Sequence, residues 1–157
     1  MEKFKKLKFN RFIERFKLNN IQTQGEQNSI EINYQKLENP EKLINEIIET
    51  KKIFYYLNTE KKNNNQIIEK EITGIVVYSE KEEKSFLIEN INVFKDIFEN
   101  SEILKIGYKQ KEDYILLKQV GINPTNLMFD IEIAGYILNS TISKYSIEYL
   151  SNEYLRI

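Results

Sequence analysis

The stretch from Ile106 to Ser140 reads IGYKQKEDYILLKQVGINPTNLMFDIEIAGYILNS and decides the fold of this chain. Its apolar residues recur first at strand spacing and then at helix spacing, and the pattern repeats once. Gly121 directly follows the first predicted helix, where a left-handed glycine commonly ends a helix. Strands that alternate with helices are typical of α/β domains. We expect a strand over 103–106, a helix over 110–120, a strand over 127–129 and a helix over 131–138.

Other strands come before this stretch without helices between them, so a mixed sheet is expected. The apolar and aromatic run Lys52–Leu57 is typical of a central strand. Upstream, Asn39 and Pro40 predict the start of a helix, with Asn39 as N-cap and Pro40 as first helical residue. The remaining expected elements are strands over 30–34, 71–78 and 85–88, helices from Pro40 to about Thr50, over 92–99 and over 146–155, and a polar loop over 61–66.

The N-terminal segment Glu2–Leu18 places six apolar residues close to helical spacing, with Lys and Arg between them. This pattern predicts an amphipathic helix that is basic on its outer face. The polar segment Asn19–Ser29 is predicted to be a linker, so residues 1–29 precede a domain over 30–157. No apolar run approaches the ~20 residues of a membrane span, and the N-terminus lacks the apolar region of a signal peptide. We expect a cytoplasmic protein with no membrane partner.

The composition excludes several kinds of active site. The chain contains no Cys and no His, which rules out thiol nucleophiles, zinc–thiolate sites and histidine general bases. Chemistry must therefore rely on carboxylates, Lys, Arg, Tyr and hydroxyl groups, and only three of the 24 acidic residues are Asp. The net charge is −1, whereas a protein that binds nucleic acid on its own usually has an excess of Lys and Arg.

The stretch from Ile106 to Ser140 contains a series of motif residues, in the order Gly107, Asp113, Gly121-Ile122, Phe129-Asp130 and Tyr136-Ile137-Leu138-Asn139. In this order they resemble the 3′–5′ exonuclease domain of bacterial DNA polymerase I, the family A polymerases of replication and repair. The resemblance covers roughly residues 30–157. It implies a ribonuclease H-like fold, with a mixed five-stranded sheet flanked by helices. The N-terminal segment also resembles the one that joins the 5′ nuclease domain to this domain, through Leu7, Phe9, Phe12 and Arg15-Phe16.

The resemblance implies a two-metal site built from four carboxylates, because divalent cations of this kind prefer oxygen ligands. The family's first motif, Asp-x-Glu, falls on Asn58-Thr59-Glu60, so Asn58 replaces the Asp that would bridge both metals. In the second motif, Asp113 is kept together with Gly107 and Lys111, and Lys109 replaces an Asn. The third motif, Tyr-x-x-x-Asp, has no counterpart before Ile157. The implied metal positions are therefore Glu60 and Asp113, with Asn58 as a degenerate third.

Each of these residues also has a structural explanation that leaves metal binding aside. A lone Asp such as Asp113 at a helix start, beside Glu112, is commonly solvated, and Glu60 next to two lysines fits a polar turn. Asp130 precedes a helix and is better explained as its N-cap. Lys residues between 105 and 118 alternate with acids, which is typical of a solvated face. The Tyr and Phe residues mostly fall at inward positions, which favours core packing over base stacking.

The sequence therefore favours a vestigial, non-catalytic exonuclease-like domain that serves as a scaffold in a bacterial polymerase. DNA would be reached through the parent polymerase, and the domain would contact the polymerase and 5′ nuclease domains within that chain. No cofactor is expected under this reading. The first alternative is an active exonuclease that uses Mg²⁺ or Mn²⁺. In it, Glu69 or Glu71 would supply the carboxylate that is missing at Asn58. The second alternative is a free-standing interaction module that binds a partner through the N-terminal helix.

Overall fold

The computed structural model describes residues 34–37, 39–61 and 70–155, and all of them belong to one compact unit. Several expected features lie outside the described residues. They are the amphipathic helix over 2–18, the linker over 19–29, the first four residues of the strand over 30–34, and all but the first residue of the loop over 61–66.

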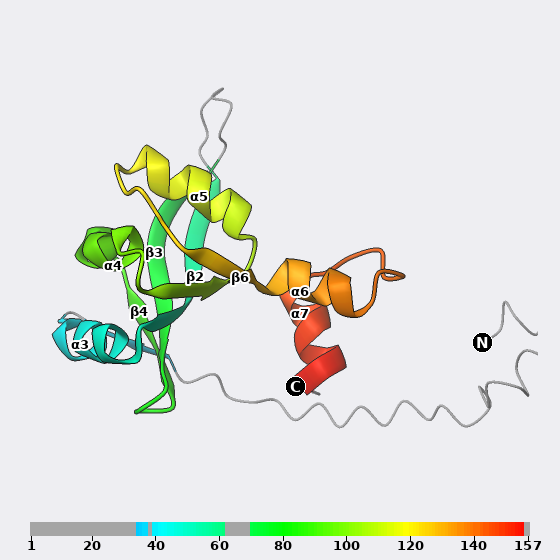
Figure 1. The fold of residues 1–157 in the computed structure, drawn as a ribbon, viewed down its shortest axis with the longest axis horizontal. Helices are drawn as coiled ribbons and strands as arrows, with labels where there is room; N and C mark the ends of the chain where they lie inside the picture. The colour runs from blue at the N-terminus through cyan, green and yellow to red at the C-terminus, as the bar shows by residue number, and fades with distance from the viewer. Residues whose placement is uncertain (1–33, 38, 62–69, 156–157) are drawn as a thin grey trace, which may run out of the picture. The chain divides into compact units, whose positions relative to one another are not determined.

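A six-stranded mixed sheet forms the centre of the domain (Figure 1). The strand order is β1-β4-β3-β2-β5-β6, in which β2–β3 and β3–β4 are antiparallel and the other neighbours are parallel. The mixed α/β sheet is thus confirmed, but it has six strands and not five, because the short β1 also joins it beside β4. The strands are β1 (Tyr34–Lys36), β2 (Lys52–Lys61), β3 (Lys70–Ser79), β4 (Lys84–Ile88), β5 (Leu104–Gly107) and β6 (Leu127–Asp130).

The helices follow the expected order with two local differences. The expected helix over 92–99 is a 3₁₀ turn followed by a short α-helix, and the last helix continues as a π-helical turn. In Figure 1, α3 and α4 lie to the left of the strands, and α6 and α7 lie to the right, beyond the end of β6. The elements are α3 (Glu41–Thr50), η2 (Ile91–Phe94), α4 (Lys95–Glu99), α5 (Gln110–Gln119), α6 (Ile131–Leu138), α7 (Ile147–Leu150) and η3 (Ser151–Leu155).

Two helix ends test the predicted boundaries. Helix α3 begins at Glu41, so Pro40 and not Asn39 occupies the N-cap position. Asn39 still caps in part, since its side-chain oxygen accepts a hydrogen bond from the Glu41 backbone N–H at 3.1 Å. At the end of α5, Gly121 has φ +79°, which confirms the predicted left-handed residue after the helix.

The apolar core lies on one face of the sheet. Alternate residues of β2, namely Ile53, Tyr55 and Leu57, are buried there, as the two-residue period of a strand requires. Helices α3, α4 and α5 cover this face. Their core residues are Leu43, Ile47, Ile97, Phe98 and Leu117.

Strand β2 is longer than predicted, and this changes the setting of the first motif. The strand continues through Asn58, Thr59 and Glu60 to Lys61, so the expected polar turn at Glu60 is wrong. Backbone pairing with β3 extends the strand into polar residues, since pairing partners outweigh local propensity. The register shifts between Asn58 and Thr59, where Thr73 is an extra residue on β3.

None of the helices among the described residues has the length and apolar character needed to span a membrane.

Candidate functional site

Asp113 is the one implied metal position that the structure buries. It lies in the first turn of α5 and is only 6% exposed, so the solvated position considered for it is wrong. Its Oδ2 atom makes no hydrogen bond of regular geometry with any described residue. Burial raises the pKa of Asp113 from 3.8 to about 7; the Tyr55 hydroxyl opposes this rise, and the Asp130 and Glu112 carboxylates add to it. The carboxyl is therefore poised between its neutral and charged forms near neutral pH.

Tyr55 lies beneath this carboxyl, in the middle of β2. Its ring packs edge-on against Phe98 at 5.0 Å between centroids, and the side chain is 6% exposed. Its hydroxyl, like Asp113 Oδ2, lacks a hydrogen bond of regular geometry among the described residues. The two groups are nevertheless close enough to shift each other, because burial and then the Asp113 carboxyl raise the pKa of Tyr55. Sequence reasoning missed Tyr55, which looked like an ordinary core aromatic residue.

Gly107 makes room for the Tyr55 ring. A Cβ atom at Gly107 would lie 2.9 Å from the Cε1 and Cζ atoms of that ring, closer than real Cβ contacts come. The last residue of β5 must therefore be small for Tyr55 to reach Asp113. This packing gives a physical reason for one of the glycines in the motif.

A small cavity of about 100 Å³ opens beside Asp113. Lys70 of β3 and Glu112 of α5 form an ion pair across it, with 3.1 Å between Nζ and Oε1. Among the described residues its lining includes neither Asn58 nor Glu60. It is lined by Tyr56, Leu57, Thr59, Lys70, Tyr108, Lys109, Glu112, Asp113 and Leu116.

The other two implied metal positions, Asn58 and Glu60, are both exposed on β2. Glu60 lies opposite Glu71 of β3 in the strand register. Glu69, the other acid considered as a replacement, lies outside the described residues. Within the described ranges, no three acidic side chains come together in an arrangement that could hold a metal ion. The implied positions hold an amide at Asn58, an exposed carboxylate at Glu60 and a buried carboxyl at Asp113, and this set does not fit a two-metal centre.

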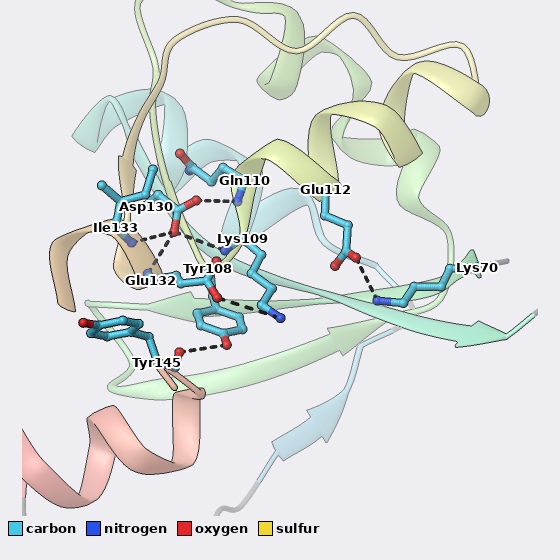
Figure 2. A network of polar contacts seen from close by, with 9 residues as sticks. All are labelled: Lys70, Tyr108, Lys109, Gln110, Glu112, Asp130, Glu132, Ile133 and Tyr145. Carbon is cyan, nitrogen blue, oxygen red and sulfur yellow. Dashed lines mark hydrogen bonds and ion pairs between the residues drawn. The ribbon is translucent and has the colours of Figure 1, made fainter. Parts of the chain in front are cut away.

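Asp130 organises the backbone next to the cavity (Figure 2). Its Oδ1 accepts hydrogen bonds from the backbone N–H groups of Glu132 at 2.8 Å and Ile133 at 3.5 Å, which confirms the predicted N-cap of α6. The same carboxylate accepts from the N–H groups of Lys109 at 3.2 Å and Gln110 at 2.7 Å, at the start of α5. One side chain thus joins two helix starts. The second role has no sequence signal, because it depends on residues twenty positions away.

Tyr108 and Lys109 lie between these helix starts and Tyr145, which precedes α7 (Figure 2). The Tyr108 hydroxyl donates a hydrogen bond to the carbonyl oxygen of Tyr145 at 3.0 Å. Lys109 Nζ lies 5.4 Å from the centroid of the Tyr108 ring and 3.9 Å from Glu132 Oε1. Lys109 has a left-handed backbone, with φ 59°, which its N–H bond to Asp130 supports.

Lys105 contradicts the expectation of a solvated lysine face. Its side chain is fully buried on β5, and its Nζ donates a hydrogen bond to the carbonyl oxygen of Asn100. Burial lowers the pKa of Lys105 to about 8. The aromatic residues also depart from the predicted inward pattern, since Tyr56, Tyr78 and Tyr114 are each more than 40% exposed.

Known proteins resemble this chain in sequence and in fold. The family model described as the ribonuclease H-like domain of DNA polymerase I matches residues 55–156. DNA polymerase I of Borreliella burgdorferi is 36% identical over 88 residues, which cover 55% of this chain and 10% of that protein. The chain thus spans about a tenth of the length of this relative.

Two solved structures show the same fold. RNase D of Trypanosoma brucei, in its GMP complex, has a TM-score of 0.64 and 13% identity, over 79% of this chain and 42% of that chain. The POL domain of Pol1 from M. smegmatis has a TM-score of 0.62 and 11% identity, over 80% of this chain and 23% of that chain. The family model matches well over half of the sequence, and the chain therefore belongs to the ribonuclease H-like domains of DNA polymerase I.

Proposed function

We propose that this domain is a non-catalytic scaffold, working in the cytoplasm as part of a DNA polymerase I during replication and repair. The observation that carries the proposal is the residue set around Asp113. Asn58 supplies an amide where the family's motif has a carboxylate, and neither Asn58 nor Glu60 lines the cavity at Asp113. DNA would be reached through the rest of the polymerase, to which the domain would attach.

The charge balance supports this proposal. At an effective dielectric of ~20, removing one carboxylate from within ~4 Å of a divalent cation removes several kcal/mol of attraction. Lys70 and Lys109 also line the cavity at Asp113, and they are ion-paired with Glu112 and Glu132, so among the described residues Asp113 is the one lining carboxyl that forms no ion pair with a lysine. Asp113 would also have to give up its proton near neutral pH before it could bind a metal, since its pKa is raised to about 7.

An active exonuclease using Mg²⁺ or Mn²⁺ is the second candidate. The observation in its favour is that Glu60 and Glu71 are direct partners on neighbouring strands, so two carboxylates project from the same part of the sheet. For this candidate, further ligands would have to come from residues outside those described. The free-standing interaction module stays a prediction, since the N-terminal segment on which it rests lies outside the described residues.

Isothermal titration calorimetry with Mg²⁺ and Mn²⁺ tests the proposal. The full chain is compared with Asn58→Asp and with the control Asn45→Asp, which adds the same charge on the exposed side of α3. We expect no site tighter than about 1 mM in any of the three, because one restored carboxylate leaves the ligand set incomplete. Micromolar binding by the unmodified chain, with Mn²⁺-dependent degradation of single-stranded DNA that Glu60→Gln abolishes, would establish the exonuclease instead.

A further inference from the structure

Helix α6 exposes apolar side chains where a surface helix normally carries polar ones. Its sequence, IEIAGYIL, contains one charged residue, Glu132. Ile133 and Tyr136 are each 56% exposed, Ile137 is 75% exposed and Leu138 is 68% exposed. A helix that is apolar around most of its circumference is typically buried in a larger assembly. By contrast, α3 concentrates its apolar residues on its inner side, at Leu43 and Ile47.

The exposed apolar area continues onto β6. This strand is at one edge of the sheet, and its residues Met128 and Phe129 are 71% and 49% exposed. A groove of about 480 Å³ lies between β6, α6 and α5, and its lining includes the side chains of Tyr114, Ile115 and Ile133. We call the β6–α6 apolar surface the set of Met128, Phe129, Ile133, Tyr136, Ile137 and Leu138. Contiguous apolar surfaces of this kind mark interaction sites.

The chemistry of this surface selects a protein partner. Between Leu127 and Leu138 there is no Lys or Arg, and Lys111 is the one cation among the residues that line the groove, so a nucleic-acid backbone would find little positive charge to neutralise it. Eight helical residues extend only ~12 Å and cannot cross a bilayer. An apolar protein surface, whose large side chains enter the groove, is the occupant that matches these properties.

The length of the relatives indicates where such a surface would come from. The region matched in the B. burgdorferi DNA polymerase I is 10% of that protein, so nine tenths of its chain lies elsewhere. Likewise, the present chain covers 23% of the M. smegmatis Pol1 structure. In a polypeptide of that kind, much further protein surface is available to the domain at high local concentration.

We propose that the β6–α6 apolar surface is the docking surface through which this domain packs against the remainder of a DNA polymerase I polypeptide. The proposal rests on the scaffold function given above and names the surface that performs it. The groove beside Ile133 would receive an apolar side chain of the partner, and α6 would be covered along Ile137 and Leu138. Exposed residues on α3 would remain free of the partner.

The test measures binding in trans between the full 157-residue chain and B. burgdorferi DNA polymerase I lacking its own ribonuclease H-like domain, after its primer extension activity has shown it to be folded. Ile133→Lys and Ile137→Lys are compared with the control Ile48→Lys on α3, a position that is 54% exposed. Circular dichroism confirms that each variant is folded. We expect a one-to-one complex that both surface variants weaken by about tenfold or more and that the control leaves within about twofold.

Three results would overturn the proposal. The first is the absence of a complex with the unmodified chain, and the second is equal weakening by all three variants. The third is a defined dimer of the chain alone that Ile137→Lys abolishes, which would assign the surface to a second copy. Mn²⁺-dependent nuclease activity is measured on the same samples as a separate readout. Activity would overturn the scaffold function, whereas loss of binding without activity would overturn only the assignment of the docking surface.

Discussion

Asp113 shows at the scale of one residue how burial changes the meaning of a sequence motif. The same Asp that the motif marks as a metal position is buried beside Tyr55, and burial raises its pKa to about 7. An acid whose folded pKa is raised keeps its proton in the folded state at a pH where the unfolded chain has lost it. The folded state therefore loses stability as the pH rises from about 4, the unfolded value, to about 7.

We therefore predict that the free energy of unfolding falls between pH 4.5 and pH 7.5, with Asp113 contributing up to about 3 kcal/mol of the fall. Asp113→Asn should remove this contribution, because an amide does not titrate. The chain has no histidine that would titrate in the same window. Urea unfolding at both pH values measures the difference, with Asp96→Asn on the exposed side of α4 as the control. A fall of the same size in Asp113→Asn would contradict the prediction.

The sequence identified both Asp113 and Asp130, but it predicted the surroundings of Asp130 only in part and those of Asp113 not at all. The N-cap role of Asp130 was predictable because its signal is local, an Asp directly before an apolar helix. The burial of Asp113 was not, because it depends on Tyr55, which reaches it across Gly107 from another strand. The prediction of a solvated Lys105 was wrong for a similar reason. Its alternation with acids suggested solvent, but β5 lies between two other strands of the sheet.

At the scale of elements, Asp130 fixes the start of α5 relative to the start of α6. It accepts four backbone N–H bonds, two from each helix start. We predict that Asp130→Ala lowers the free energy of unfolding by about 2–4 kcal/mol, more than the ~1 kcal/mol of an ordinary N-cap. Ser146→Ala provides the comparison, because Ser146 caps α7 through one bond, from the Tyr149 N–H at 3.3 Å. Equal losses in urea unfolding would mean that the bonds to α5 contribute little.

Element boundaries were predicted best where local sequence signals decide them. Helix α5 and Gly121 agree with the pattern almost residue by residue. The end of β2 does not, because Asn58, Thr59 and Glu60 are polar and are held in the strand by β3. This matters for the site, since the motif belongs to a paired strand and not to a flexible turn. The positions of Asn58 and Glu60 are therefore set by the sheet.

At the scale of the whole molecule, the β6–α6 apolar surface is the feature that bears on association with other proteins. A monomer that has no further partner rarely leaves a helix such as α6 with Ile137 and Leu138 about 70% exposed. Surface charge offers no comparable stabilisation, because the ion pairs among the described residues, such as Lys36–Glu89, involve side chains that are all more than a third exposed. Such pairs each contribute little to stability. The apolar surface is therefore the feature most able to direct association.

We predict that the isolated chain, although folded, enhances the fluorescence of ANS at pH 7, an anionic dye whose aromatic rings bind exposed apolar surface. Ile137→Lys combined with Ile133→Lys should reduce this signal at least about twofold, because it interrupts a continuous apolar area. The free energy of unfolding should change by no more than about 0.5 kcal/mol, since both side chains are exposed. Ile48→Lys removes one isolated apolar side chain and should leave the signal unchanged. Because dye binding here is apolar, it should also persist in 0.5 M salt, where screening of surface charges is nearly complete; a signal that disappears in salt would instead locate the dye on charged groups.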